Sequence, residues 1–557
     1  MFPMHHGIQS TAGKIGILLA CAIVLMGAEI GIHHLRHDRI DQFSGNGDEA
    51  SHFVTGLMIR DYLVQDFGHN PVPFAKAYYL HYPKVAFGSW PPLMHLGLAL
   101  WMLVFPPIRE SAALYTDLLT AVLAISAAMF ARRSLPLVLA GAVGAAVWLS
   151  PLIQELDQEF LADLQYGLIA MACIYLFASY VDDSRPMHAA WFGLALLGAV
   201  MTKNNALFLA ISVPLVILLT RSFQLLRRWD FWLSLVPAVL FVGVWQYLTL
   251  PFNTYNMAGR NAETAVSKLF AANFVDLAKI AWIGLLPFIL WGVYRVVVVP
   301  LMDSGRVRSC DAASFALMLG APLFHSLLPH GAHERYLTPC LAPLLIFAIE
   351  GGRDLLARLR FMPNSARLAA AAALVVLPAA AQPVGLRFDS NFGTAAAQII
   401  NRFPAEQSVL ISGYFGAESA LIAELAVRDR RPGLYALRAT KILRHKVRKY
   451  NRDTEVVATS KQEMIEYFRD LPVGLVVLMD DGDAETKTSR DYLAEMIHEK
   501  PDLFQLVSSM PMGHPLWSTC RSSDPCTIGI YKFTGEPANT RFDPGKLPNN
   551  MPLWTGL

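Results

Sequence analysis

The segment Ser44-Gly45-Asn46-Gly47-Asp48-Glu49-Ala50-Ser51-His52 opens a long polar stretch after the first hydrophobic run of this 557-residue chain. Its glycines and asparagine favour a turn, and a helical pattern begins directly after them. Apolar residues then recur with helical spacing at positions 50, 53, 54, 57, 58 and 62, whereas polar residues occupy the opposite face. This pattern predicts a helix that lies in a membrane interface, with Asp48 and Glu49 in its first turn.

Two carboxylates at the start of a helix suit a chemical role. The helix dipole keeps them ionised, as a proton acceptor or a cation ligand must be. The structural alternative is that Asp48 is an N-cap residue and Glu49 its solvated neighbour.

The composition indicates a polytopic membrane protein with a soluble part. Hydrophobic residues make up 54% of the chain and charged residues only 16%, and the mean hydropathy is +0.38. Average soluble domains have roughly 25% charged residues. The first apolar run, residues 15–28, reads as an uncleaved transmembrane helix. Cys520 and Cys526 lie close together near the C-terminus and would form a disulfide in an oxidising compartment.

Hydropathy and charge together predict about eleven crossings, with the N-terminus in the cytoplasm and the C-terminal part outside it. The apolar segment 91–107, bounded by Pro-Pro pairs, is read as re-entrant or interfacial. Every second loop between the spans then carries arginines, as the positive-inside rule requires of cytoplasmic loops. The predicted spans are 14–33, 111–131, 135–150, 162–181, 188–202, 205–220, 231–250, 276–299, 312–329, 336–350 and 365–382.

The opposite face collects acids, histidines and a second set of bases at helix ends. Ionisable groups at membrane depth are costly and mark a pathway or a site. This face therefore predicts a site that combines carboxylates with cations suited to phosphate. It receives Asp48, Glu49, Lys84, Glu155, Asp157, Glu159, Asp163, Lys203, Arg260, Lys268, His330, His333, Glu334, Arg335 and Tyr336.

The chain changes character near residue 382. Short strand-like runs alternate with helical stretches, which predicts a soluble α/β domain over 383–557 with a largely parallel sheet. Residues 1–382 form the transmembrane domain, whose first outer loop, 34–110, carries interfacial helices. The expected strands are 408–411, 433–437, 455–458, 473–479, 503–507 and 527–531, and the expected helices are 415–429, 439–449, 461–471 and 488–499. The soluble part has no phosphate-binding loop motif, so we expect a binding or capping module.

An ordered set of short motifs resembles the GT-C glycosyltransferases, most closely the bacterial relatives of protein O-mannosyltransferases and of the lipid A aminoarabinose transferase. The resemblance covers roughly residues 10–380. Its motifs are Gly47-Asp48-Glu49-Ala50, Trp90-Pro91-Pro92-Leu93, Asp157 after Ser150-Pro151, Thr202-Lys203 and Glu334-Arg335-Tyr336-Leu337.

The resemblance implies transfer of a sugar from a polyprenyl-phosphate donor to a hydroxyl acceptor, with inversion, on the periplasmic face of the bacterial inner membrane. It implies that Asp48 is the general base, that Glu49 orients the base or the sugar, and that Asp157 lines the cavity. Lys203 and Arg335 would hold the carrier phosphate. Further candidates for binding substrate are His333, Tyr336, Arg260 and Lys84. The implied partners are the lipid-linked donor, a lipid, glycan or protein acceptor, and membrane lipids, with no nucleic acid.

Several alternatives stay open at this point. Lys203 would simply extend to the interface, and Arg335 would form a structural pair with Glu334 or Asp157. A divalent metal is conceivable at Asp48, His330, His333 or Glu334, although their spacing fits no strong signature. The alternative function is a transporter or flippase for a lipid-linked or anionic substrate. Such a protein would be expected to show an internal repeat and ionisable residues near mid-span.

Overall fold

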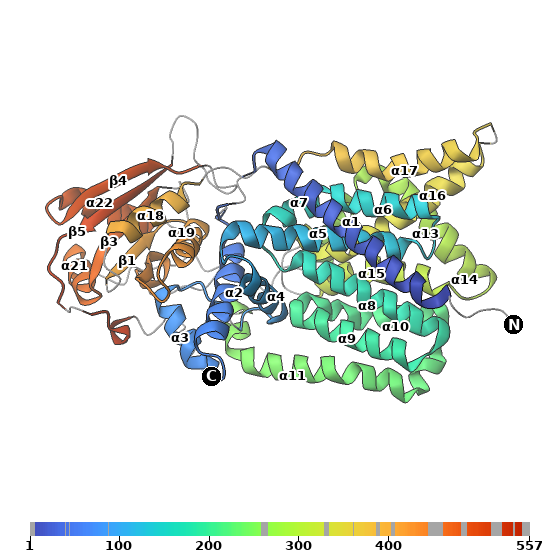
Figure 1. Ribbon diagram of the computed structural model, residues 1–557, viewed down its shortest axis with the longest axis horizontal. Coiled ribbons are helices and arrows are strands. Elements are labelled where there is room, and N and C mark those ends of the chain that lie inside the picture. Colours follow the sequence, from blue (N-terminus) through green and yellow to red (C-terminus); the bar gives the residue numbers. More distant parts are fainter. Residues whose placement is uncertain are drawn as a thin grey trace.

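The computed structural model consists of a helical bundle and a smaller α/β domain, with the helices α2, α3 and α4 between them (Figure 1). The structure describes residues 6–38, 41–43, 45–86, 88–257, 266–327, 333–359, 361–385, 390–402, 407–443, 460–480, 487–513, 526–538 and 541–547.

The elements of the bundle, and α2, α3 and α4 beside it, are all helices. They are α1 (His6–Arg36), α2 (Gly47–Gln65), α3 (Pro71–His81), α4 (Leu93–Val104), α5 (Arg109–Ala131), α6 (Leu137–Leu149), α7 (Pro151–Gln158), α8 (Asp163–Asp183), α9 (Pro186–Thr202), η1 (Asn204–Phe208), α10 (Leu209–Thr220), η2 (Phe223–Arg227), α11 (Trp229–Met257), α12 (Val266–Ile280), η3 (Ile283–Leu285), α13 (Leu286–Val293), η4 (Tyr294–Val298, a π-helical turn), α14 (Val299–Asp303), α15 (Ser309–Ser326), η5 (Glu334–Cys340), α16 (Leu341–Ala357) and α17 (Asn364–Ala381).

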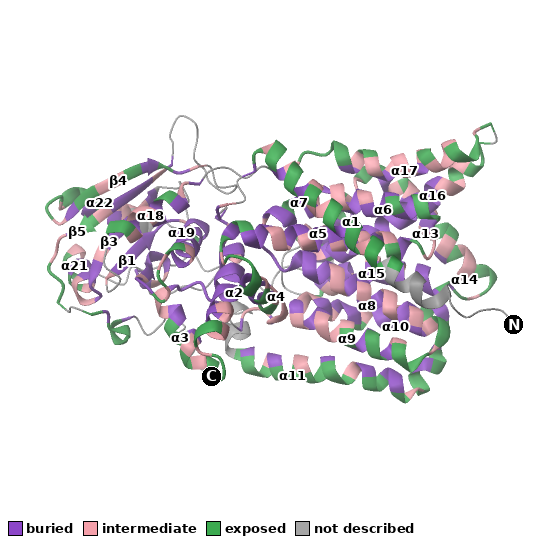
Figure 2. Cartoon of the chain, in the orientation of Figure 1, coloured by how far each residue is buried: buried purple, intermediate pink, exposed green. Residues whose placement is uncertain are grey.

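The predicted polytopic helical architecture is confirmed. Among the described residues, six stretches are long and apolar enough to cross a membrane, and the bent pair α6–α7 brings the number to seven. The shorter apolar helices α9 and α10 coincide with two further predicted spans. Figure 2 shows that many residues of α11 are exposed, with buried ones between them. Only 22% of its most apolar window is buried.

The span predicted over 276–299 is wrong at its start. Residues 266–280 form the separate helix α12, and the chain turns at Trp282, whose φ is 54°. The apolar span begins only at Ile283 and runs to Asp303. Asp276 and Lys279 form an ion pair at 2.9 Å on α12, which explains why this polar turn stays out of the span.

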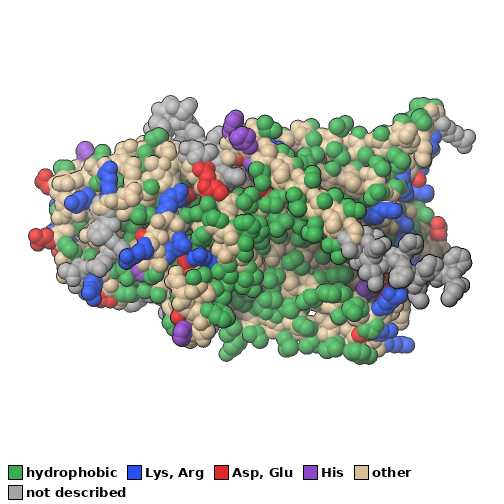
Figure 3. Space-filling view, in the orientation of Figure 1, with side chains coloured by type: hydrophobic (Ala, Val, Ile, Leu, Met, Phe, Trp, Pro, Cys, Tyr) green, Lys and Arg blue, Asp and Glu red, His purple; other side chains and the backbone are tan. Residues whose placement is uncertain are grey.

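The arginine-bearing loops meet at one end of the bundle. Arg133, after α5, pairs with Asp182 at the end of α8. Arg228, before α11, donates to Tyr180 near the end of α8, and the amide of Val307 donates to the carbonyl of Leu219. The helix α1 begins at this same end, opposite the α/β domain (Figure 1). Figure 3 shows hydrophobic side chains over the middle of the bundle and charged ones towards its ends.

The helix α4 has 12 residues, about 18 Å of helix at 1.5 Å per residue, too short to span a hydrocarbon core of about 30 Å. The placement of α2 in a membrane interface stays a prediction. Both faces of α2 are buried, because α4 covers one side and the soluble domain reaches the other. Its polar residues tolerate burial because Ser51 and Thr55 donate to backbone carbonyls one turn earlier.

The soluble domain is α/β, as the sequence predicts, but its sheet is mixed rather than largely parallel. The strand order is β2-β1-β3-β5-β4; the first three strands are parallel, and β5 runs antiparallel to both neighbours. The predicted strand 455–458 lies outside the described residues. The elements are α18 (Phe392–Arg402), β1 (Ser408–Ser412), α19 (Phe415–Arg428), β2 (Tyr435–Arg438), α20 (Ala439–Ile442), α21 (Lys461–Asp470), β3 (Val473–Asp480), α22 (Lys487–Glu499), β4 (Phe504–Pro511), β5 (Thr527–Phe533) and η6 (Pro544–Lys546).

The disulfide expected at Cys526 is present. Cys520, its expected partner, lies outside the described residues.

Candidate functional site

Asp48 lies in the first turn of α2, where the glycine-rich turn becomes a helix. The N-cap is Asn46, whose side-chain oxygen accepts from the Asp48 amide at 3.0 Å. The carboxylate of Asp48 is therefore not the cap. It points to Arg335, whose Nη2 donates to its Oδ2 at 2.9 Å. About a third of the Asp48 side chain stays exposed.

Arg335 comes from the start of η5, the short helix between α15 and α16. Among the described residues, Arg335 pairs with Asp48 and not with Glu334 or Asp157. Burial opposes the charge of Arg335, but the fields of Asp163 and Asp48 outweigh it and raise the pKa of this guanidinium. The group is a permanent cation at the end of the Asp48 carboxylate.

Lys203 ends α9 and turns inwards rather than extending to the interface. It is 7% exposed, and its Nζ lies 2.5 Å from Oδ1 of Asp163 in the first turn of α8. Burial lowers the pKa of Lys203, and the attraction of Asp163 opposes this shift. Asp48 also contributes to the field at Lys203.

Tyr336 lies at the centre of these groups. Its ring centroid is 4.7 Å from Nζ of Lys203 and 5.4 Å from the guanidinium carbon of Arg335. The rings of His325 and His333 lie 5.2 and 5.6 Å from it. An aromatic face attracts cations, so Tyr336 helps to keep two positive groups close together. Five predicted site residues thus share one place: Asp48, Lys203, His333, Arg335 and Tyr336.

The soluble domain contacts the Asp48 turn through the start of α19. A Cβ on Gly47 would lie 2.0 Å from the ring of Phe415, and one on Gly416 would lie 1.7 Å from the carbonyl oxygen of Gly45. Only glycine fits at these two contacts. Lys84 lies beside them, with its Nζ 4.3 Å from the Phe415 ring centroid. Burial, with repulsion from Arg438, lowers the pKa of Lys84 well below its usual value.

Glu49 points away from this group into the protein. Nε and Nη2 of Arg109 donate to its Oε1 at 2.9 and 2.6 Å, and the two side chains are 0% and 2% exposed. The pair ties α2 to the start of α5. Glu49 is therefore held by a structural ion pair, which differs from the position expected of a residue that orients the sugar.

Asp157 belongs to another buried cluster. Its Oδ2 lies 2.9 Å from Nε2 of His33, and Thr120 donates to its Oδ1 at 2.6 Å. These partners come from α1 and α5. The structure thus gives Asp157 neighbours other than Asp48, Lys203 and Arg335, and Asp163 is the second acid beside the two cations.

Arg260 and His330 lie outside the described residues. Glu334 is 45% exposed and lies 3.4 Å from Lys279. Among the described residues, side chains with metal-ligand chemistry gather at Glu29, His33 and Asp157, not around His333 and Glu334.

Sequence reasoning placed Asp163 on the same face as the site but gave it no role, and it missed the pair His52–His95. Asp163 opens α8 immediately after a turn, the same signal that singled out Asp48. His52 follows Asp48 by one helical turn, and its Nδ1 lies 2.9 Å from Nε2 of His95. Burial, with repulsion from His95, lowers the pKa of His52 well below its usual value, so this pair is neutral near pH 7. The ring of Trp90 packs on His52 at 4.4 Å.

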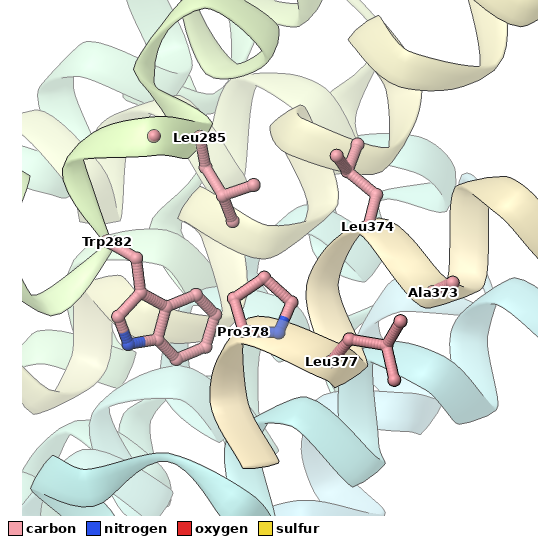
Figure 4. A pocket seen from close by; sticks show the side chains of 7 residues that line it. Trp282, Leu285, Ala373, Leu374, Leu377 and Pro378 are labelled. Atoms are coloured by element: carbon pink, nitrogen blue, oxygen red, sulfur yellow. The ribbon is translucent and has the colours of Figure 1, made fainter. Parts of the chain in front are cut away.

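An apolar hollow of about 370 Å³ lies elsewhere, between η3 and α17. Figure 4 shows Trp282, Leu285, Leu374, Leu377 and Pro378 around it. Its lining carries no charged side chain, so it offers nothing for catalysis.

The side chains around Asp48, namely Asp163, Lys203 and Arg335, together with Asp48 itself, could bind an anion and accept a proton at one place. Arg335 and Lys203 present several N–H donors in a partly buried setting, where charged hydrogen bonds are strong. Asp48 is a partly exposed carboxylate beside them. The acids and bases pair with one another, so an incoming anion would have to compete with Asp48 and Asp163.

No protein-family profile and no curated protein matches the chain. Among solved structures, it is similar to ArnT from Cupriavidus metallidurans in the apo state, with 14% identity, a TM-score of 0.58, and coverage of 93% of this chain and 98% of that one. The same protein bound to undecaprenyl phosphate gives 14% identity, a TM-score of 0.54 and the same coverage.

The likeness to the oligosaccharyltransferase of Archaeoglobus fulgidus in its apo form is weaker, with 11% identity, a TM-score of 0.48, and coverage of 83% of this chain and 69% of that one. The chain therefore has the fold of ArnT, the GT-C fold that its sequence motifs predict.

Proposed function

We propose that this protein is a membrane glycosyltransferase that moves a sugar from a polyprenyl-phosphate donor to a hydroxyl group, with inversion at the anomeric carbon. The acceptor is a lipid, a glycan or a protein. The observation that carries the proposal is the Asp48–Arg335 contact of 2.9 Å beside the buried Lys203. The shared fold with ArnT, which has been solved with undecaprenyl phosphate, supports the class of donor.

Arg335 and Lys203 would bind the phosphate of the donor. Negative charge grows on this phosphate as the glycosidic bond breaks, and fixed cations in a site with little water stabilise that charge most. Arginine matches two phosphate oxygens at once, whereas lysine supplies a compact charge. His333 and Tyr336 would line the same space, and the apolar tail of the donor would lie among the helices.

Asp48 would be the general base. In the structure its carboxylate is paired with Arg335. We infer that the donor phosphate draws Arg335 towards itself and so frees Asp48 to accept the proton of the acceptor hydroxyl. The oxygen then attacks the anomeric carbon from the face opposite the leaving phosphate, which inverts the centre. Glu49 would support this arrangement through its ion pair with Arg109 and would not contact the sugar.

The arginine-bearing loops support a proposal for the sidedness of the reaction. They gather at the end of the bundle opposite Asp48 and the α/β domain, and the positive-inside rule assigns such loops to the cytoplasm. We propose accordingly that the site and the α/β domain face the periplasm of the bacterial inner membrane. The disulfide at Cys526 fits an oxidising compartment.

The position of the charged groups favours an enzyme over a transporter or flippase. The charged groups of the site lie at helix ends towards the soluble domain; they are Asp48, Asp163, Lys203 and Arg335. A transporter would place its coupling groups near mid-span, between two repeated halves.

Asp48→Asn and Arg335→Ala test the two roles separately. In a deletion strain that re-expresses Asp48→Asn, transfer should fall by about 10²–10⁴-fold, and polyprenyl-phosphate-linked sugar should accumulate. The purified variant should still bind undecaprenyl phosphate in native mass spectrometry. Arg335→Ala should lose both binding and transfer, because it removes a phosphate contact formed before the reaction.

Asp182→Asn is the matched control, since it removes an exposed carboxylate from an arginine pair at the other end of the bundle. It should behave as wild type. Near-normal transfer by a folded Asp48→Asn protein would refute the role of Asp48. Unchanged envelope glycans and lipid-linked sugars in the deletion strain would refute the function.

A further inference from the structure

A buried cluster around His33 has no role in the proposed transfer. Three carboxylates face Nε2 of this histidine: Oδ2 of Asp157 at 2.9 Å, Oδ1 of Asp117 at 3.6 Å and Oε1 of Glu29 at 3.9 Å. The four side chains are between 0% and 3% exposed. They come from α1, α5 and α7, close to the end of the bundle that carries the soluble domain.

The single positive charge of a protonated His33 does not balance the negative charges of this cluster. A fourth carboxylate, Asp38, lies 3.1 Å from Nδ1 of His33, so one imidazolium would face four buried acids. The neighbouring Arg36 donates to the side-chain oxygen of Gln154. Within the described residues, neither carboxylate oxygen of Asp117 has a hydrogen-bond partner, and this side chain is 0% exposed. Uncompensated buried charge is strongly unfavourable, so the cluster lacks a cation.

We propose that Glu29, His33, Asp117 and Asp157 bind one divalent transition metal ion of the zinc class. Zinc lies about 2.0–2.2 Å from imidazole nitrogen and carboxylate oxygen in tetrahedral sites, which separates neighbouring ligand atoms by about 3.4 Å. The three distances from His33 Nε2, 2.9, 3.6 and 3.9 Å, bracket that value. Ligand atoms of Glu29, His33 and Asp157 all lie within 4.8 Å of one another. Asp117 is not part of that group, and it would complete the set from its position 3.6 Å from His33 Nε2.

The groups around the four ligands are those that a metal site needs. Asp38 accepts from Nδ1 of His33, which leaves Nε2 to face the metal. Thr120 donates to the Asp157 oxygen that faces away from His33, at 2.6 Å. Gln154 and Trp148 donate to Glu29 at 2.8 and 2.5 Å. Such outer contacts orient ligands and raise metal affinity.

The proposed ion would have a structural role. Four protein ligands leave no open position for a reacting water, as in closed zinc sites. The ion would join α1 to α5 and α7. This link would matter for α1, because only 11% of its most apolar window is buried against the rest of the protein. From Asp157 the chain runs two residues to Glu159, whose carboxylate accepts from Asn46, the N-cap of the Asp48 helix. The site would therefore also brace the position of that helix.

The test is metal binding by the full chain, purified in detergent without chelators. Elemental analysis should find about one zinc ion per chain. Protein stripped of metal should bind added Zn²⁺, and the bound ion should raise its unfolding temperature. Co²⁺ should give the visible absorption of a tetrahedral site. Asp117→Asn keeps the shape of the ligand but removes its charge, and it should lower zinc affinity by at least about 10-fold. His33→Gln should abolish the cobalt spectrum.

Asp182→Asn serves as the control and should bind zinc like wild type. The proposal is overturned if stripped wild-type protein binds neither Zn²⁺ nor Co²⁺ at one equivalent, a result that does not depend on any variant folding. It is also overturned if Asp117→Asn binds zinc with wild-type affinity and unfolds at a higher temperature than wild type. Asp117 would then be an uncompensated buried charge and not a metal ligand. Metal content is independent of transfer activity, so the result stands apart from the proposed function.

Discussion

Glu49→Gln should destabilise the protein without a direct effect on the chemistry of Asp48. The substitution keeps the size of the side chain, but it leaves the guanidinium of Arg109, 2% exposed, without the carboxylate that accepts its Nε and Nη2 at 2.9 and 2.6 Å. Removing one partner of a buried ion pair costs about 3–5 kcal/mol. At 1.4 kcal/mol per factor of ten, the unfolding equilibrium shifts by roughly two to three and a half decades.

The measurement compares thermal unfolding in detergent with transfer at a temperature where both proteins are folded. Glu49→Gln should unfold at a clearly lower temperature yet keep much of its transfer rate. The double variant Glu49→Leu/Arg109→Met replaces both charges with apolar groups of similar size, which is often close to neutral for stability. It should recover most of the stability that the single variant loses.

The opposite pattern would refute this reasoning. A Glu49→Gln protein with wild-type stability and strongly reduced transfer would place Glu49 in the chemistry, as the sequence resemblance implies. A stable but inactive double variant would lead to the same conclusion.

Two further predictions concern the soluble domain. Gly47→Ala should push against the Phe415 ring, since its Cβ would lie 2.0 Å away; the cost is about 1–3 kcal/mol, and Phe415→Ala in the same chain should restore thermal stability. Gly416→Ala should be worse and resist such rescue, because its Cβ would meet the backbone oxygen of Gly45 at 1.7 Å. Alkaline phosphatase fused after residue 400 should be active and β-galactosidase inactive; the reverse result would place the site in the cytoplasm.

Much of the helical bundle could be predicted because its signals are local. Hydropathy gave the approximate bounds of α5, α8 and α17, and arginines in alternate loops predicted which loops share one end. Arg133, Asp182 and Arg228 confirm that grouping through contacts between loops that are distant in sequence. The Asp48 turn was visible for the same reason, since two glycines, an asparagine and two acids mark a helix start.

The partners of the charged residues could not be predicted, because pairing depends on tertiary distance. Asp157 and Asp163 are six residues apart in similar surroundings, yet one contacts His33 and the other Lys203. Glu49 and Asp48 are adjacent, but successive helical residues point about 100° apart, so Glu49 points inwards to Arg109 whereas Asp48 stays partly exposed beside Arg335. The polar face of α2 was misread because sequence periodicity does not distinguish water from another domain as the neighbour.

The geometry of the Asp48 turn shows that three different parts of the chain support the proposed base. Asn46 caps α2 and donates to Glu159, directly after α7. Gly47 packs on Phe415 of α19, and Glu49 is fixed by Arg109 of α5. With both neighbours of Asp48 fixed, the direction of its side chain is set before any substrate arrives, and preorganisation of this kind supplies much of a catalytic advantage. The soluble domain thus contributes to the support of the proposed base, because Phe415 of α19 lies against the Gly47 side of the turn.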